Sequence, residues 1–352
     1  MRLLKVCYKT TLVTAQIAMV FQFVKFVRDR FSVRSSSVDE EKRYVAMQHN
    51  HGRLGNQIFY FCTGYVIAKQ LGRTLYVPYD QSEERDFNVM RRMLWTTEIF
   101  PRLRPLYTIF EQRSISQTVV PFAYNQTNQP ACCLYEDPKK FANHRAKFLL
   151  LDIKFGQNIR FIEDYLAEIS ELLTFAKGIR DEGKSAVQRL NFGYANAMCV
   201  HIRMKDFVTL NISTDAGSTI RITRQIARMK GFKKFMVFGD DQLFMKSIAD
   251  NLELDEEGKR RYIVGISTFS EGVDLYVASQ VCGAFFISAA TSTFGWWLAF
   301  FTNNQSAIYY MDDKRSMWDK TPGEDLFLFC SNEEEITVYQ AKQSKDGKAI
   351  AQ

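Results

Sequence analysis

The sequence predicts an α/β fold made of two Rossmann-like lobes with the active site in the cleft between them. Short apolar runs alternate with segments of helical periodicity, which is typical of parallel sheets. Glycines or polar side chains follow three of the apolar runs, and ligands of open parallel sheets bind beyond the carboxyl ends of the strands. The 352 residues are 46% hydrophobic and 24% charged, so the chain is globular and long enough for two sub-domains.

The first lobe is expected to open with a strand, a helix and a second strand at residues 45–48, 57–71 and 74–78. Residues 80–138 carry many aromatic residues and prolines and are interpreted as loops, and a helical stretch follows near 161–190. Further strands then alternate with helices, which indicates a second parallel sheet. These later strands are expected at residues 197–203, 234–239, 262–264 and 284–288.

The segment 198–206 is the most informative one, because an apolar run delivers three polar side chains to its downstream end. His201 and Arg203 share one face of the predicted strand, and Asp206 falls in the loop beyond it. A planar guanidinium at such a place suits a phosphate group. The alternative is a surface strand with an ordinary salt bridge.

A second segment, residues 45–72, has the pattern of a strand, a loop with two glycines and a helix. The loop, residues 51–57, is called the glycine loop below. Gly52 and Gly55 would let the backbone approach a ligand, and the free N–H groups of the new helix favour an anion. Arg53 and Asn56 can add side-chain donors. Such loops also occur merely as tight turns.

A third segment repeats this plan after the strand at 284–288. Ser292 and Thr293 begin an apolar helix, where a hydroxyl serves either as an N-cap or as a phosphate contact. Trp296 and Trp297 are expected in the core, because apolar residues surround them.

In this order, the segments resemble the α-1,2-fucosyltransferases of glycosyltransferase family 11, within a wider fucosyltransferase superfamily. The family motifs are Gly-Arg-Leu-Gly-Asn-Gln, His-x-Arg-Arg-Gly-Asp, Ser-Asp-Asp and Ser-Thr-Phe-x-Trp-Trp. The corresponding segments here are residues 52–57, 201–206, 239–241 and 292–297, and the resemblance covers about residues 44–310. Met204 and Lys205 replace the usual Arg-Gly, and Gly239 replaces the serine.

The resemblance implies the GT-B arrangement, GDP-fucose as the donor, and inverting transfer to a galactose hydroxyl of a glycan acceptor with an α-1,2 linkage. It also implies no cofactor and no obligatory metal, and the chain contains no Asp-x-Asp pair of the kind that holds a cation in metal-dependent transferases. The loops at residues 80–138 would then face the acceptor.

The resemblance further implies a role for each motif residue. Arg203 would stabilise the leaving diphosphate, and His201 and Asp274 would read the guanine; an N-cap is the alternative for Asp274. Asp206 is the candidate base, or it orients Arg203. The other donor-binding candidates are Gly52, Arg53, Gly55, Asn56, Ser292 and Thr293.

Two other functions compete with transfer. Residues 178–185 formally match the Gly-x-x-x-x-Gly-Lys-Ser phosphate loop of magnesium-dependent nucleotide hydrolases, but the preceding segment has helical spacing and no strand, which favours a chance match. A catalytically silent relative in the secretory pathway, binding a sugar nucleotide or a glycan, is the second alternative, which the change at Met204 and Lys205 keeps open.

The N-terminal region suggests a membrane location. Basic residues flank the mostly apolar run 10–24, which predicts an uncleaved signal-anchor; an amphipathic helix or a cleaved signal is the alternative. The expected protein is a single-pass type II Golgi membrane protein with a lumenal body. The expected divisions are a tail and anchor at 1–27, a short stem at 28–43, an acceptor-side lobe at 44–190, a donor lobe at 191–332 and a polar tail at 333–352.

Charge and cysteines refine this expectation. The net charge of +7 lies mostly in residues 1–43, since the rest holds 37 Lys or Arg against 35 Asp or Glu, so no nucleic-acid partner is predicted.

Cys62, Cys199 and Cys282 are expected as buried thiols. The expected disulfide partners are Cys132, Cys133 and Cys330, and the glycosylation sequons lie at Asn125, Asn211 and Asn304.

Overall fold

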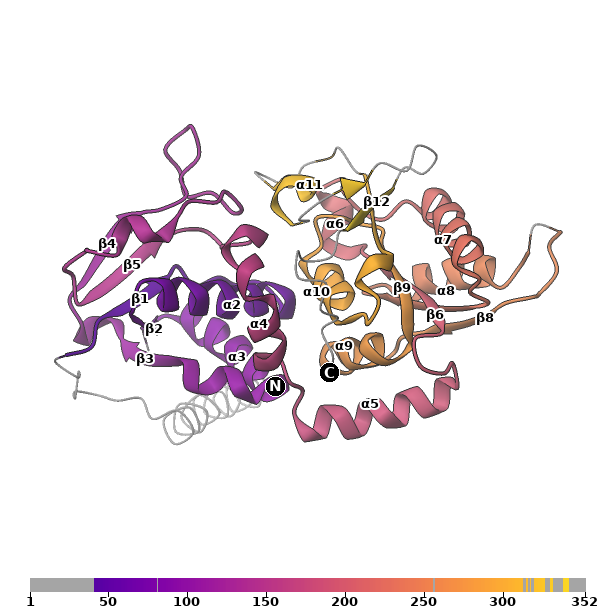
Figure 1. The fold of residues 1–352 in the computed structure, drawn as a ribbon, viewed down its shortest axis with the longest axis horizontal. Helices are drawn as coiled ribbons and strands as arrows, with labels where there is room; N and C mark the ends of the chain where they lie inside the picture. The colour runs from indigo at the N-terminus through magenta and orange to yellow at the C-terminus, as the bar shows by residue number, and fades with distance from the viewer. Residues whose placement is uncertain are drawn as a thin grey trace, which may run out of the picture.

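The computed structural model describes residues 41–80, 82–255, 257–312, 315, 317, 320–326, 330–331 and 338–341. It is an α/β protein with two separate sheets, one in each half of the chain (Figure 1). This confirms the predicted fold class of two Rossmann-like lobes. The predicted N-terminal anchor and most of the predicted stem lie outside the described residues. Among the described residues, no helix is long and apolar enough to cross a membrane.

The first lobe holds a five-stranded parallel sheet in the order β3-β2-β1-β5-β4. The buried strand β1 is followed by α2, whose sequence is apolar on nearly every face because the helix lies between the two lobes. The elements are β1 (Tyr44–Met47), α2 (Leu54–Gln70), β2 (Thr74–Tyr79), α3 (Glu84–Ile99), η1 (Pro101–Leu106), β3 (Tyr107–Glu111), η2 (Gln112–Ser114), β4 (Gln117–Pro121), η3 (Pro138–Phe141) and β5 (Phe148–Asp152).

The expectation that residues 80–138 are mainly loops is wrong. The helix α3 and the strands β3 and β4 occupy much of this region. Both strands lie at the edges of the sheet, where mixed polar side chains are tolerated, and this is why they do not read as apolar runs.

A helical connection joins the lobes through η4 (Ile159–Phe161), η5 (Glu163–Tyr165), α4 (Leu166–Leu172) and α5 (Lys177–Leu190). The formal phosphate-loop match therefore lies inside α5, and the glycine at position 183 packs against the ring of Tyr276. The chance-match interpretation is confirmed, because a phosphate loop requires a loop after a buried strand.

The second lobe holds a seven-stranded sheet in the order β11-β12-β10-β9-β6-β7-β8. Five strands are parallel, and β12 joins β10 and β11 in antiparallel pairs. The elements are β6 (Ala197–Ile202), α6 (Lys205–Thr209), α7 (Ala216–Lys230), β7 (Lys234–Gly239), α8 (Gln242–Leu252), β8 (Ile263–Ile266), α9 (Glu271–Val281), β9 (Cys282–Ile287), α10 (Thr293–Phe301), η6 (Gln305–Ala307), β10 (Ile308–Met311), α11 (Pro322–Asp325), β11 (Cys330–Ser331) and β12 (Val338–Ala341). The strand β12 lies within the segment expected to be only a polar tail.

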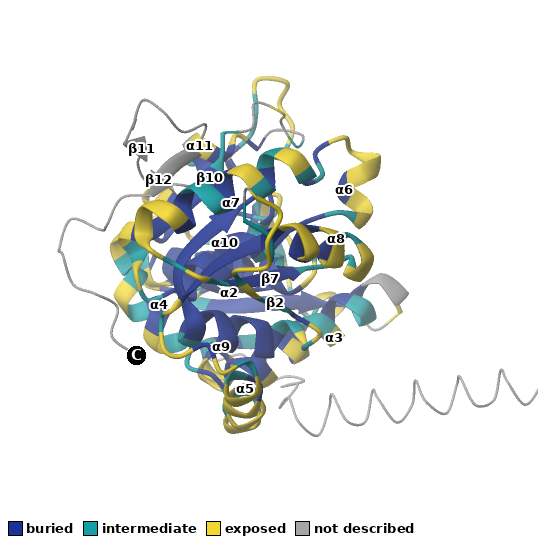
Figure 2. Ribbon diagram, turned by 90° about the vertical axis from the view of Figure 1, so that its right-hand side faces the viewer, coloured by how far each residue is buried: buried dark blue, intermediate teal, exposed yellow. Residues whose placement is uncertain are grey.

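The two lobes share one hydrophobic core, which runs from Val45 in β1 to Leu326 after α11. At the boundary α2 packs on α10, and the ring of Phe59 contacts those of Trp296 and Trp297 with centroids about 5 Å apart. Figure 2 shows the buried residues concentrated in α9, α10 and the central strands, whereas α5 is exposed along its outer side. The predicted core position of both tryptophans is confirmed.

The cysteines differ in part from expectation. Cys62 is a buried free thiol, as predicted. The prediction of free thiols at Cys199 and Cys282 is wrong, because these residues form a disulfide between the adjacent strands β6 and β9. Cys132 and Cys133 are bonded to each other.

Candidate active site

The candidate site lies where the strand order reverses in each sheet. The central strand β1 lies between β2 and β5, and β6 lies between β7 and β9. In a doubly wound sheet, the loops that leave such central strands diverge and open a crevice at their carboxyl ends. The glycine loop follows β1, the Arg203 loop follows β6, and the loop before α10 follows β9. Three sequence motifs are thereby brought to the facing ends of two sheets.

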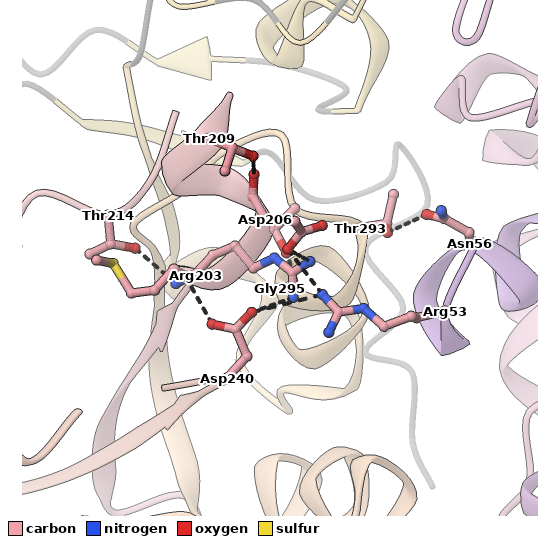
Figure 3. A network of polar contacts seen from close by, with 11 residues as sticks. Arg53, Asn56, Arg203, Asp206, Thr209, Thr214, Asp240, Thr293 and Gly295 are labelled. Atoms are coloured by element: carbon pink, nitrogen blue, oxygen red, sulfur yellow. Dashed lines mark hydrogen bonds and ion pairs between the residues drawn. The ribbon is translucent and has the colours of Figure 1, made fainter. Parts of the chain in front are cut away.

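Arg203 is the centre of this site (Figure 3). Its guanidinium donates to Asp240 Oδ2 at 2.6 Å and to Asp206 Oδ1 at 2.5 Å. The residue is 9% exposed, and its Nε–H is buried with no hydrogen-bond partner among the described residues. The ring of Phe207 lies beside the guanidinium, 4.7 Å from ring centroid to guanidinium carbon. This arginine is rigidly held, and it retains an unsatisfied donor.

Neighbouring strands hold the backbone at Arg203. Its N–H donates to Thr214 Oγ1 at 2.9 Å, and Thr214 Oγ1 lies 2.8 Å from Ser288 Oγ in the loop after β9. Asp240, after β7, also accepts the Met204 N–H at 2.8 Å. The Arg203 loop is thus tied to the ends of the strands on both sides of β6.

Arg53 reaches the same carboxylates from the other lobe (Figure 3). Its Nη2 lies 3.5 Å from Asp206 Oδ1 and 3.8 Å from Asp240 Oδ2. Two guanidiniums therefore face two carboxylates across the lobe boundary.

Arg53, Arg203, Asp206 and Asp240 form one group of ion pairs, called the Arg203 cluster below. Asp206 contacts both arginines and is the most exposed member, with 58% of its side chain accessible. Its contact with Arg203 is the one that an orienting role requires. Lys205, the residue before it, adopts a φ of 21°, on the border of the left-handed region that favours glycine. This conformation explains why glycine suits that position of the motif.

His201 and Asp274 are both buried. His201 Nδ1 has no partner among the described residues and lies against Gly295, where a Cβ would come within 2.6 Å of it. Burial lowers the pKa of His201 to about 3, so the ring is neutral. Asp274 lies inside α9, whose N-cap is Ser270, so the N-cap alternative for Asp274 is wrong.

The Asp274 carboxyl accepts a hydrogen bond from Ser267 Oγ. Burial raises the pKa of Asp274 to about 8, with the nearby Glu271 contributing and the Ser267 hydroxyl opposing. The side chain is therefore largely protonated at neutral pH. A buried proton on a carboxyl close to the cleft is a feature that motif spacing does not reveal.

Two further charged residues, Glu271 and Arg92, belong to no motif and interact electrostatically with each other. Glu271 opens α9, and burial raises the pKa of its carboxyl, while the charges of Arg53 and Arg92 oppose that shift. Arg92 projects from α3, the helix that the sequence interpretation missed. Arg53 of the glycine loop and Arg92 of α3 thus both lower the pKa of the same carboxyl group, at the start of α9.

The starts of α2 and α10 meet directly. A Cβ at Gly55 would lie 2.7 Å from the Phe294 nitrogen, and Trp297 Nε1 donates to the Gly55 carbonyl at 3.0 Å. Thr293 Oγ1 donates to Asn56 Oδ1 at 2.7 Å (Figure 3). The close backbone approach that glycine allows at position 55 is therefore occupied by the other lobe.

The remaining motif residues have local roles. Ser292 is the N-cap of α10 and accepts from the Gly295 N–H at 3.4 Å, as the capping alternative predicted. Gly52 lies on the side chain of Asn56, where a Cβ would come within 2.1 Å of Nδ2. Asp241 caps α8 by accepting the Phe244 N–H.

Three further features of the described residues bear on the predicted site: one cavity, the candidate metal ligands and the glycosylation sequons. A cavity of about 480 Å³ lies between the end of α3 and the start of α5, and none of its lining residues belongs to the Arg203 cluster. Within the described residues, no group of three or more His, Cys, Asp or Glu side chains could hold a metal ion. Asn211 and Asn304 are exposed, and Asn125 is half-buried.

Comparisons with known proteins point in one direction. The family model described as Glycosyl transferase family 11 matches residues 138–321, just over half of the 352-residue chain. A Caenorhabditis elegans galactoside 2-alpha-L-fucosyltransferase is 30% identical over 189 residues, which are 52% of this chain and 51% of that protein. The chain thus spans about half the length of this relative.

Two more distant matches extend over more of the chain. Another Caenorhabditis elegans galactoside 2-alpha-L-fucosyltransferase is 24% identical over 284 residues, covering 74% of this chain and 68% of that protein. Among solved structures, POFUT1 in complex with GDP aligns with a TM-score of 0.48 and 12% identity, over 75% of this chain and 95% of that chain.

Proposed function

The chain belongs to glycosyl transferase family 11, and we propose that it transfers fucose from GDP-fucose to a galactose hydroxyl of a glycan, forming an α-1,2 linkage. The two Caenorhabditis elegans relatives named as galactoside 2-alpha-L-fucosyltransferases support the sugar and the linkage. The observation that carries the proposal is the buried Arg203 with a free Nε–H, held at the carboxyl end of β6 and joined by Arg53 from the opposite lobe.

The proposed reaction is a single inverting displacement. The acceptor hydroxyl oxygen bonds to the anomeric carbon of fucose while the bond from that carbon to the diphosphate oxygen breaks, and GDP leaves. Negative charge then grows on the diphosphate, and pre-placed guanidinium N–H groups stabilise it. Arg203 offers a planar guanidinium that can donate two parallel hydrogen bonds, and Arg53 adds a second positive charge. In the proposed mechanism these two side chains, and no metal ion, supply the positive charge.

Asp206 has to release its contact with Arg203 when the diphosphate arrives. It is exposed and lies one helical turn from Arg203 in the sequence, whereas Asp240 is mostly shielded, with 13% of its side chain accessible, and also accepts the Met204 N–H. We therefore assign Asp240 to orienting Arg203 throughout, and Asp206 to a replaceable contact. After release, Asp206 takes the acceptor's proton, or it orients the loop and the proton passes to the departing diphosphate.

The test is transfer in the presence of a chelator. Purified protein is incubated with GDP-fucose and galactose-terminated acceptors in EDTA, and fucosylated product is measured for wild type, Arg203→Ala and Arg203→Lys. We expect product from wild type and at least a roughly hundredfold loss in Arg203→Ala, because removing one preorganised donor typically has this effect. Lysine restores only part of the activity, since a point charge is not a bidentate fork.

Arg224→Ala is the matched control, because Arg224 is a partly buried arginine that donates to the Asn251 and Leu254 carbonyls far from the cluster. Its activity should stay near that of wild type. If wild type binds GDP-fucose but yields no product on any acceptor, the silent-relative alternative replaces the proposal. If GDP-fucose does not bind, the donor is wrong.

The proposed setting is the Golgi lumen, with the N-terminal segment as a signal-anchor. Exposed sequons at Asn211 and Asn304 support a lumenal body, because glycans attach only to accessible asparagines. Expression in a secretory host followed by glycosidase digestion tests this, and loss of a mass shift in an Asn211→Gln, Asn304→Gln double variant identifies the sites.

A further inference from the structure

Four polar side chains form a series of hydrogen bonds across the lobe boundary beside the start of α10. This series, called the relay below, consists of Lys320, Gln157, Asn56 and Thr293. Lys320 is only 4% exposed. Its Nζ donates to Gln157 Oε1 at 2.6 Å and to the Thr291 carbonyl oxygen at 3.2 Å. Gln157 Nε2 donates in turn to Asn56 Oδ1 at 2.9 Å. Burial of an ammonium group is costly, and Gln157 and the Thr291 carbonyl offset part of that cost.

The donor and acceptor atoms of these side chains fix the direction of each hydrogen bond in the relay. An ammonium group only donates, so the Gln157 atom that faces Lys320 has to be the carbonyl oxygen. The amide nitrogen of Gln157 therefore faces Asn56 and requires an oxygen there. Thr293 Oγ1 lies 2.7 Å from the same Asn56 oxygen and donates to it. With its oxygen held by two donors, the Asn56 side chain has its NH₂ group turned the other way.

The NH₂ group of Asn56 lies on the glycine loop. A Cβ at Gly52 would come within 2.1 Å of Asn56 Nδ2, so the group sits against the backbone just before Arg53. Asn56 itself is only half-buried, whereas Gln157 and Lys320 are closed off from solvent. The relay thus runs from the buried Lys320 through Gln157 to the amide protons of Asn56. Figure 3 shows its far end, where Asn56 and Thr293 lie beside Arg53 and the residues around Arg203.

We propose that Lys320 and Gln157 are positioning residues that orient and polarise Asn56, so that its N–H groups meet the negative charge that develops on the leaving diphosphate. The inference rests on the proposed function and names two residues that act through Asn56. Hydrogen bonds in series strengthen one another in a low-dielectric interior. A donor fixed before the reaction stabilises developing charge without reorganisation. No proton moves along the relay.

The decisive variants are Lys320→Met and Gln157→Glu. Methionine removes the charge and keeps the length of the side chain. The glutamate keeps an acceptor for Lys320 but has no N–H for Asn56, so it breaks the relay while retaining a partner for the buried ammonium. We expect each variant to lower kcat with GDP-fucose about tenfold to hundredfold, with the acceptor KM unchanged. Lys320→Arg, which keeps the cation, restores part of kcat.

Lys234→Met is the matched control. Lys234 is a half-buried lysine in the same lobe that donates to the Asn191 and Phe192 carbonyls, away from Asn56. Its removal should change thermal stability without changing kcat. A purely structural role for Lys320 predicts instead that Gln157→Glu, with its buried pair retained, keeps wild-type kcat.

The outcomes separate the two proposals. If wild type shows neither GDP binding nor product, the proposed function fails before any variant is compared. If wild type turns over and the folded Lys320→Met and Gln157→Glu proteins stay within about twofold of its kcat, the relay is overturned and the proposed function stands. If Lys320→Met does not fold, Gln157→Glu decides by the same criterion.

Discussion

At the scale of single residues, the carboxylates of the Arg203 cluster differ in how they are held. Asp240 is mostly buried and bonded to both Arg203 and the Met204 N–H, whereas Asp206 is exposed and bonded through Oδ1 alone to the two arginines. A buried hydrogen-bonded partner fixes the arginine before substrate arrives, and an exposed partner can be displaced.

We therefore expect Asp240→Asn to lower kcat by about tenfold or more, because the guanidinium loses its fixed orientation. Asp206→Asn should bind GDP as tightly as wild type or more tightly, since the diphosphate no longer competes with a carboxylate. The pH–rate profile distinguishes a base from an orienting group. Loss of the acidic limb in Asp206→Asn identifies Asp206 as the base, and an unchanged limb assigns it to orientation.

The Asp274 carboxyl leads to a second expectation, about pH. In the free protein burial raises its pKa to about 8, and the guanine contacts implied by the family resemblance require the ionised form. Guanine binding then lowers the pKa, so binding releases a proton and affinity for GDP falls as pH falls below 8. Between pH 8 and pH 7 the loss is about fivefold, because the ionised fraction of a group with a pKa of about 8 falls from about one half to about one eleventh.

Calorimetry in buffers of different ionisation enthalpy measures this proton release directly. Asp274→Asn is the control for protons that come from GDP itself, and it should show a weaker affinity with a flatter pH dependence. Equal pH dependence in wild type and Asp274→Asn would contradict the assignment of Asp274 to guanine.

At the scale of elements, two glycines of α5 allow a test with opposite signs. Both belong to the formal phosphate-loop match, but they lie in a helix. A Cβ at Gly178 meets nothing within 4 Å, while one at Gly183 would lie 2.1 Å from Tyr276 Cδ1. Gly178→Ala should therefore stabilise the protein by about 0.5 kcal/mol, because alanine loses less backbone entropy in a helix. Gly183→Ala should destabilise it by about 1–3 kcal/mol through overpacking.

Thermal unfolding monitored by circular dichroism measures both changes, and the transferase assay accompanies it. A phosphate loop would respond differently, with activity lost in both variants and stability barely changed. A stability increase in Gly178→Ala with unchanged transfer activity agrees with the helical assignment of these glycines.

The sequence predicted some elements well and others poorly, for physical reasons. The strand at 234–239 agrees with β7 because a buried central strand is an uninterrupted apolar run that ends in glycine and aspartate. The edge strands β3 and β4 carry polar residues and were missed, as was α3, in which charged residues interrupt the apolar pattern. The Cys199–Cys282 disulfide depends on β6 lying beside β9, across a separation of 83 residues that no local pattern records.

The candidate site divides in the same way. Arg203, Asp206 and Arg53 were found because each follows a strand inside a motif, and parallel sheets bring such ends together. Gln157 and Lys320 are isolated polar residues outside every motif, and their contact spans 163 residues. Only the three-dimensional arrangement of the lobes reveals them.

At the scale of the whole molecule, the question is whether the two lobes behave as one body. Lobes joined by a small polar interface move and unfold separately, whereas a large apolar interface couples them. Here one core of buried side chains continues from β1 through α2, α9 and α10. Trp297 lies at its centre, fully buried, with its Nε1 bonded to the Gly55 carbonyl of the opposite lobe.

We therefore expect a single cooperative unfolding transition, with tryptophan fluorescence and far-ultraviolet circular dichroism giving the same midpoint. Trp297→Phe should lower the stability of both lobes together by about 2 kcal/mol, because it leaves the Gly55 carbonyl without its donor and removes part of a buried ring. Trp95→Phe is the control, since Trp95 is 42% exposed on α3 and its change should be nearly neutral. Two resolved transitions, or a Trp297→Phe effect confined to one of them, would show that the lobes fold independently and that the Asn56 to Thr293 contact forms only when they close.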